Sequence, residues 1–130
     1  MFRSLTLVAV ILTFAGVGSA QSKAGSWLSG TWTGTGYQID ANETWTMKVT
    51  FKGKKYTIEY PSLNCSGRWL LISFGSRLAK LRERITNGVD KCIDRGTVTI
   101  QRLNRRQIEF RYQNHKQTLF SASGILNREQ

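Results

Sequence analysis

The sequence predicts an all-β protein, an eight-stranded antiparallel up-and-down meander that closes into a small barrel. Apolar and polar residues alternate with a period of two in segment after segment, which is typical of half-buried strands. Short turns join these segments, which favours antiparallel neighbours, and no segment shows a convincing helical period. Closure of the meander would remove exposed sheet edges. A two-sheet sandwich is the alternative.

Residues 1–20 are predicted to be a secretory signal peptide. Arg3 precedes an uncharged, mostly apolar run over 5–17, and Gly18-Ser19-Ala20 offers the small residues typical of a cleavage site. The run is shorter than the ~20 apolar residues that a membrane-spanning helix needs. The mature chain, 21–130, is expected to be one domain, periplasmic or secreted, with no transmembrane segment after cleavage.

Four strands are expected in the first half of the mature chain, after a lead-in, at residues 30–39, 45–51, 56–60 and 68–74. The clearest is 45–51, where apolar residues from Trp45 to Phe51 alternate with threonine and lysine. A corner containing Pro61, the only proline, precedes the fourth strand. That strand is apolar on both faces, so we expect it to be covered on both sides, at least in part.

Four more strands are expected in the second half, at residues 78–85, 97–103, 108–112 and 118–126. In the first of them, Glu83 lies in phase with apolar Leu81 and Ile85. A carboxylate on an apolar face is costly unless it is paired or hydrogen-bonded. We therefore expect Glu83 inside the barrel mouth, in contact with Arg102 or with backbone N–H groups of the cysteine corner. The alternative is a residue that turns outward near a strand end.

The two cysteines, Cys65 and Cys92, are predicted to form one disulfide. Exported chains reside where disulfides persist, and an even count without metal-ligand spacing argues for a bridge. With one histidine and no CxxC pair, a zinc site is not expected. Closure of a loop of about 28 residues should stabilise the fold by roughly 3 to 4 kcal/mol.

Gly30-Thr31-Trp32, on the first expected strand, resembles the start of calycin-type barrels such as lipocalins and avidins. A tryptophan at that place usually plugs one end of the barrel. The resemblance therefore implies a core role for Trp32.

Several motifs occur together along the mature chain: Trp32-x-Gly34 with Tyr37, Tyr60-Pro61-Ser62-Leu63-Asn64-Cys65-Ser66-Gly67, Glu83-x-Ile85 with Gly88, Cys92-Ile93-Asp94-x-Gly96-x-Val98, and Gly124. Together they resemble a group of small exported bacterial domains, some standing alone and some attached to membrane-bound sensor or kinase proteins. The resemblance implies a lipocalin-like barrel and export. It names no activity and no ligand.

The chain is strongly basic, with a formal net charge of +11. Arg3 is the only charged residue of the predicted signal, so the mature domain keeps +10. Such a field favours anionic partners. The alternative is that the surplus only keeps an exported protein soluble.

One expected strand face concentrates this charge. Lys80, Arg82 and Arg84 share that face, and a meander would bring cations of neighbouring elements beside them: Arg68, Arg77, Arg102, Arg105, Arg106 and Arg111. Interleaved with Trp69 or Tyr112, these side chains could grip phosphate, carboxylate or sulfate groups. A solvated barrel exterior would explain the same residues. No nucleic-acid motif is present, so no specific nucleic-acid partner is expected.

The sequence offers few candidates for catalytic residues. The single histidine, His115, sits in an expected turn, and both cysteines are assigned to the disulfide. The acidic residues of the turns lack a calcium-loop spacing, so no cofactor and no metal are expected.

We therefore expect an exported, non-catalytic binding protein of the cell envelope or extracellular space. Its expected partner is an anionic ligand, an envelope polymer or an acidic protein, and peripheral contact with a membrane surface fits the same charge. The alternative is an inhibitor or immunity-type protein that blocks an acidic partner enzyme.

Overall fold

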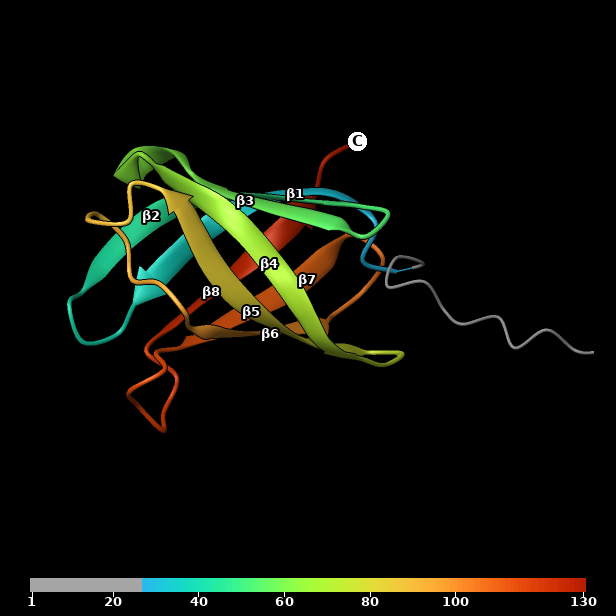
Figure 1. Ribbon diagram of the computed structural model, residues 1–130. Coiled ribbons are helices and arrows are strands. Elements are labelled where there is room, and N and C mark those ends of the chain that lie inside the picture. The colour runs from blue at the N-terminus through green and yellow to red at the C-terminus, as the bar shows by residue number, and fades with distance from the viewer. Residues whose placement is uncertain (1–26) are drawn as a thin grey trace, which may run out of the picture.

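The computed structural model describes residues 27–130, which form a closed barrel of eight antiparallel strands (Figure 1). The predicted signal peptide lies outside the described residues. The elements are β1 (Gly30–Gln38), β2 (Glu43–Lys52), β3 (Lys55–Tyr60), a 3-10 turn η1 (Pro61–Leu63), β4 (Cys65–Phe74), β5 (Leu78–Asn87), β6 (Thr97–Arg102), β7 (Gln107–Gln113) and β8 (Ala122–Arg128). Each strand pairs with the next, and β8 returns to pair with β1. The predicted fold class is thereby confirmed.

The last strand begins later than the sequence pattern suggested, at Ala122 and not at Thr118. Leu119 and Phe120 lie instead in the β7–β8 connection, with exposed side chains. Apolar character alone placed them in a strand, but they belong to a loop.

The period-two alternation places one apolar row of each strand inside the barrel. β2 shows the principle, because Met47, Val49 and Phe51 are buried while Lys48 between them is exposed. The interior is filled by side chains from several strands and from the segment before β1, the largest fully buried apolar ones being Trp32, Trp69, Phe51, Phe110, Leu28, Met47, Ile58, Leu81, Ile100, Ile108 and Leu126.

One end of the barrel is closed by the two termini of the described chain. Trp32 is fully buried, its indole Nε1 donates to the Leu28 carbonyl at 2.8 Å, and the Arg128 guanidinium lies 4.1 Å over its ring centroid. Arg128 also donates from Nη2 to the Trp27 carbonyl at 2.8 Å. Trp27 in turn stacks on Phe74 at 5.4 Å. The core role expected for Trp32 is confirmed, and we call this end the sealed end.

The structure corrects the expectation that β4 is covered on both faces. Trp69 is 1% exposed and points inward, but Leu70 is 42% and Ile72 53% exposed. A closed barrel has only one interior, and no second layer of the described chain lies over β4. A bulge at Leu71/Ser73 also interrupts the alternation there. The apolar outer residues of β4 therefore face away from the core.

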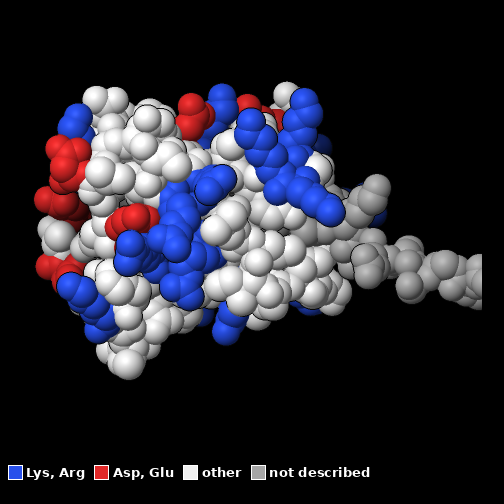
Figure 2. All heavy atoms as spheres, viewed as in Figure 1, with Lys and Arg blue, Asp and Glu red and all other residues white. Residues whose placement is uncertain are grey.

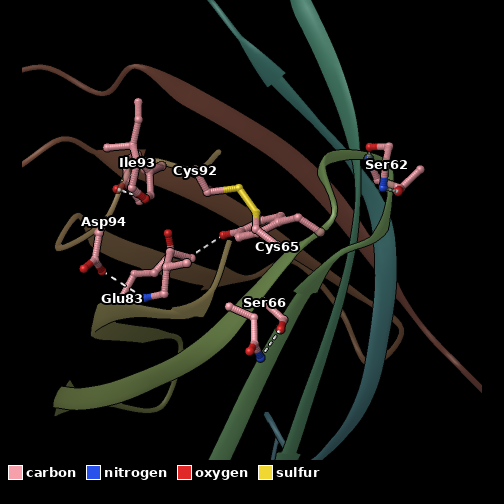
Figure 3. Close-up of a disulfide and its surroundings, with 12 residues drawn as sticks. Ser62, Cys65, Ser66, Glu83, Cys92, Ile93 and Asp94 are labelled. Carbon is pink, nitrogen blue, oxygen red and sulfur yellow. Dashed lines mark hydrogen bonds between the residues drawn. A yellow bond between two sulfur atoms is a disulfide. The ribbon is translucent and has the colours of Figure 1, made fainter. Parts of the chain in front are cut away.

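The disulfide joins Cys65, at the start of β4, to Cys92 in the long β5–β6 connection (Figure 3). The same connection is held by Asp94, whose Oδ1 accepts from the Ile85 backbone N–H at 2.9 Å. Gly88 passes close to the bridge with φ +73, and a Cβ there would lie 2.9 Å from that of Cys65. The cysteine motifs thus fasten a loop to the barrel wall.

Replacing both cysteines, Cys65→Ser with Cys92→Ser, should lower the free energy of unfolding by about 3 kcal/mol, because the unfolded chain regains the entropy of an open loop. Denaturant titration of the mature chain, with and without reductant, measures the loss. Reductant should destabilise the wild type by a similar amount and leave the double variant unchanged. If the wild type and the double variant were equally stable without reductant, this would contradict the expected role of the bridge.

Candidate functional site

A pocket lies at the end of the barrel opposite the sealed end. In an up-and-down barrel the β1–β2, β3–β4, β5–β6 and β7–β8 connections all lie at one end, on the left of Figure 1, and we call this end the mouth. The pocket there has a volume of about 160 Å³. Its walls include four aromatic side chains, one buried carboxyl group and the disulfide: Trp45, Tyr60, Phe110, Tyr112, Glu83 and Cys92.

Glu83 is the buried acid of this pocket, only 2% exposed. It accepts a hydrogen bond from Trp69 Nε1 at 2.8 Å and a very short one from the Tyr60 hydroxyl. Both bonds reach Oε2, and neither uses Oε1. Figure 3 shows Glu83 beside the disulfide. The carboxyl group is therefore fixed in orientation, with one oxygen committed to the barrel wall.

Burial dominates the ionisation of this group and raises the pKa of Glu83 to about 7. The hydrogen bonds from Trp69 and Tyr60 oppose that rise because they favour the carboxylate, while the charge of Asp94 adds to it. Burial, together with the negative charge of Glu83, also raises the pKa of Tyr60 and of Tyr112 above the usual range of a phenol. Near neutral pH the pocket thus holds two neutral phenols and a carboxyl group close to half-ionisation.

Glu83 lies inside the barrel, as its phase predicted, but the expected partner Arg102 was wrong. Arg102 ends β6 at the sealed end, where its backbone N–H donates to the Arg77 carbonyl at 2.8 Å. Glu83 lies toward the other end of the β5–β6 pair. There its backbone N–H donates to the carbonyl oxygen of Gly96, the residue before β6, at 2.9 Å. The backbone of the cysteine corner is not the partner of the carboxyl group either. Phase gives the face of a residue, whereas partners depend on register.

Two glycines shape the pocket wall. A Cβ at Gly36 would lie 2.6 to 2.8 Å from atoms of the Trp45 indole, so the ring can lie against β1 only because this residue is a glycine. A Cβ at Gly96 would collide with the Tyr112 phenol in the same way. Trp45 Nε1 is buried and, within residues 27–130, has no hydrogen-bond acceptor. It is thus an unsatisfied buried donor on the indole edge that packs against Gly36.

The basic residues expected on β5 form a separate site on the outer wall. Lys80 and Arg84 are exposed, Arg82 is partly exposed, and all three point away from the buried row that contains Glu83. Arg84 stands opposite Arg68 of β4. Figure 2 shows a continuous band of basic atoms over the middle of the visible face.

Arg111 lies beyond β6 on the same outer surface. Lys80 is opposite Thr99 of β6, which is opposite Arg111 of β7. The Arg111 guanidinium is already engaged, because Nε lies 2.5 Å from Glu109 Oε1 and the charged group lies 5.6 Å from the centroid of the Phe120 ring. Arg111 is therefore a weaker candidate for ligand contact than Lys80 or Arg84.

The structure does not interleave Trp69 or Tyr112 with these cations. Both aromatic side chains are buried inside the barrel, where they pack against Phe110 at centroid distances of 5.9 and 6.4 Å. Each alternates along its strand with an exposed arginine, so residue and neighbour occupy opposite faces. The expected site that combines basic and aromatic side chains was therefore wrong. The basic side chains lie on the outer wall, and the two aromatic side chains lie inside the barrel.

Charge is unevenly distributed along the barrel axis. Five of the eight acidic residues belong to the mouth, in its pocket or its connections: Asp40, Glu43, Glu83, Asp90 and Asp94. Acidic atoms gather along the left edge of Figure 2, over that end. Basic residues dominate the sealed end, in its turns and adjoining strand ends: Lys52, Lys54, Lys55, Arg77, Arg102, Arg105, Arg106 and Arg128. The mouth connections also carry Lys91, Arg95 and Lys116, so the mouth has a small excess of acidic residues in a chain that is basic overall.

Comparison with known proteins supports the fold. No family model and no curated protein matches the chain. Among solved structures, the chain is similar to a redesigned β-barrel, mFAP1, which was solved bound to DFHBI. The TM-score is 0.60 at 15% sequence identity, over 82% of this chain and 99% of the other. At this identity the likeness shows a β-barrel fold.

Glu83→Gln should alter the pH dependence of stability. The pKa of Glu83 rises from 4.5 to about 7 on folding, so the unfolded chain loses this proton first as the pH increases. The contribution of Glu83 to stability is then full below pH 4.5 and falls by about 3 kcal/mol as the pH rises through 7. Glutamine keeps an acceptor for Tyr60 and Trp69 but does not titrate.

Denaturant titration of both proteins from pH 4 to pH 8 checks this. The wild type should lose stability relative to the Gln variant across that window. Parallel stability profiles would show that the carboxyl group does not titrate with a raised pKa.

Proposed function

We propose that this protein is an exported, non-catalytic binding protein that attaches to an anionic surface through its outer wall over β4 and β5. The observation that carries the proposal is the basic outer face, which we define as Arg68, Lys80, Arg82 and Arg84. Arg68 and Arg84 face one another across the strand pair, so several cations point from one wall without an intervening acid on either strand's outer row. Such an array attracts phosphate or carboxylate groups.

The apolar residues beside these cations favour a lipid surface over a sugar polymer. Leu70 is directly opposite Arg82, and the exposed Ile72 and Leu78 continue the outer wall toward the sealed end. Exposed apolar side chains flanked by cations are the arrangement of proteins that lie on anionic bilayers, where the cations meet head groups and the apolar groups enter the interface. A polysaccharide would leave Leu70 and Ile72 without a partner.

Three further observations support export and binding. The disulfide suggests an oxidising compartment, and residues 1–20 have the pattern of a signal peptide, so we place the protein in the periplasm or outside the cell. The barrel is similar in fold to a redesigned β-barrel that was solved bound to DFHBI. Both cysteines are held in the disulfide and His115 lies in the β7–β8 connection, which favours binding without catalysis. Within residues 27–130, no helix has the length and apolar character needed to cross a membrane.

Reversing the charge of the outer face, Lys80→Glu with Arg82→Glu and Arg84→Glu, should weaken binding to vesicles that contain anionic lipid by at least 100-fold, at ~1 kcal/mol for each cation near the surface. Co-sedimentation at two salt concentrations measures the loss, and the wild type should release as salt increases. A matched control reverses Lys52, Lys54 and Lys55 in the β2–β3 turn and its flanks, which changes the net charge equally. Equal losses in both triple variants would rule out a specific outer face.

The apolar contribution is tested separately by Leu70→Ser with Ile72→Ser, which leaves every charge in place. This variant should bind anionic vesicles at least tenfold more weakly, because about 0.8 kcal/mol is lost for each CH₂ group that no longer enters the interface. Retention on immobilised heparin should not change. If the wild type binds heparin but not vesicles, an envelope polymer is the partner. A stoichiometric complex with an acidic enzyme in a pull-down would favour the inhibitor alternative.

A further inference from the structure

We propose that the mouth pocket binds a small organic cation, with its ammonium group against Glu83 and its apolar part between the aromatic walls. The pocket opens at the end of the barrel, whereas the basic outer face lies along its side. This site is therefore separate from the attachment surface proposed above. Either proposal can fail without the other.

The size of the pocket limits the ligand to one ring or a short chain. Its volume of about 160 Å³ is close to that of an engineered apolar cavity, about 150 Å³, that accommodates benzene. At the rim, Leu63 and Ile93 line the opening and are partly exposed. A ligand with an apolar body can thus enter past an apolar rim.

The polar groups of the pocket favour a cation. Glu83 Oε2 is held by Tyr60 and Trp69, which leaves Oε1 of the same carboxyl group for an ammonium N–H. The ring of Phe110 stacks on Trp69 at 5.9 Å and lines the pocket together with Tyr112. Aromatic faces carry negative charge density and attract cations within about 6 Å of their centroids. The pocket therefore combines a buried acid with the walls that suit an ammonium group.

The surroundings discriminate against an anion. Two acidic residues, Glu43 and Glu83, line the pocket. In the adjoining β5–β6 connection, Asp90 and Asp94 are balanced by Lys91 and Arg95. Lys91 is the only basic residue among the described residues that line the pocket. An anion would have to lose its hydration beside these acids, whereas a cation would replace water by carboxylate oxygen and aromatic faces. The charge preference of the mouth is thus opposite to that of the outer face.

The test compares three probes of nearly the same shape with the mature chain: benzylammonium, benzyl alcohol and benzoate. Titration followed by NMR reports on the indole N–H signals, among which Trp45 and Trp69 flank the pocket. Benzylammonium should shift these two signals and bind at least tenfold more tightly than benzyl alcohol. Benzoate should bind more weakly still. This comparison requires no substitution and therefore does not depend on a variant that folds.

Variants then assign the contact. Glu83→Gln should weaken benzylammonium binding at least tenfold and leave benzyl alcohol unchanged, since it removes the charge and keeps the acceptor. Glu59→Gln is the matched control, because Glu59 is exposed on the outer side of β3 and its substitution removes the same charge outside the barrel. It should bind all three probes as the wild type does.

Several outcomes would overturn the proposal. Equal affinity for benzylammonium and benzyl alcohol would make this a pocket for neutral apolar molecules, and tighter binding of benzoate would reverse the assigned charge. Equal weakening by Glu59→Gln would show that only long-range charge acts. Absence of binding by all three probes at millimolar concentration would exclude a small-ligand site. None of these results depends on vesicle binding, which tests the outer face.

Discussion

The pairing of β8 with β1 is the constraint on which the rest of the structure depends. It leaves one interior and one exterior, so a side chain can only face the core or the surroundings. The termini of the described chain then meet at one end, where Trp32 and Arg128 close it. The other end keeps the longer connections, and the pocket lies among them. Both candidate sites follow from this closure.

Much of the fold is predictable from the sequence, because a two-residue period is a local property. It assigns Glu83 to the inner row and Lys80 to the outer row without knowledge of any other strand. The partners of Glu83 require the register of β4 against β5, which places Trp69 directly opposite it. Composition does not encode that register, which is why Arg102 was chosen wrongly. Trp69 lies on the inner row because it follows Arg68, which belongs to the outer row, so it cannot share a face with the cations.

The separation of charge along the barrel axis allows one chain to offer surfaces for both anions and cations, which its net charge does not show. A single figure of +11 suggests only anionic partners. The described chain instead places cations on the side wall and at the sealed end, and acids around the mouth. At about 0.1 M salt these regions are screened from one another beyond roughly 10 Å. One small barrel can therefore present surfaces with opposite preferences, and attachment by the side wall would leave the mouth accessible.

The disulfide has a consequence for the pocket beyond the stability of the fold. Cys92 is a partner in the bridge and also a lining residue, and its neighbour Ile93 forms part of the rim. The crosslink and the Asp94 bond to β5 therefore order this wall before any ligand arrives. A preorganised wall loses less conformational entropy on binding, so a pocket of modest size can retain more of its contact energy as affinity.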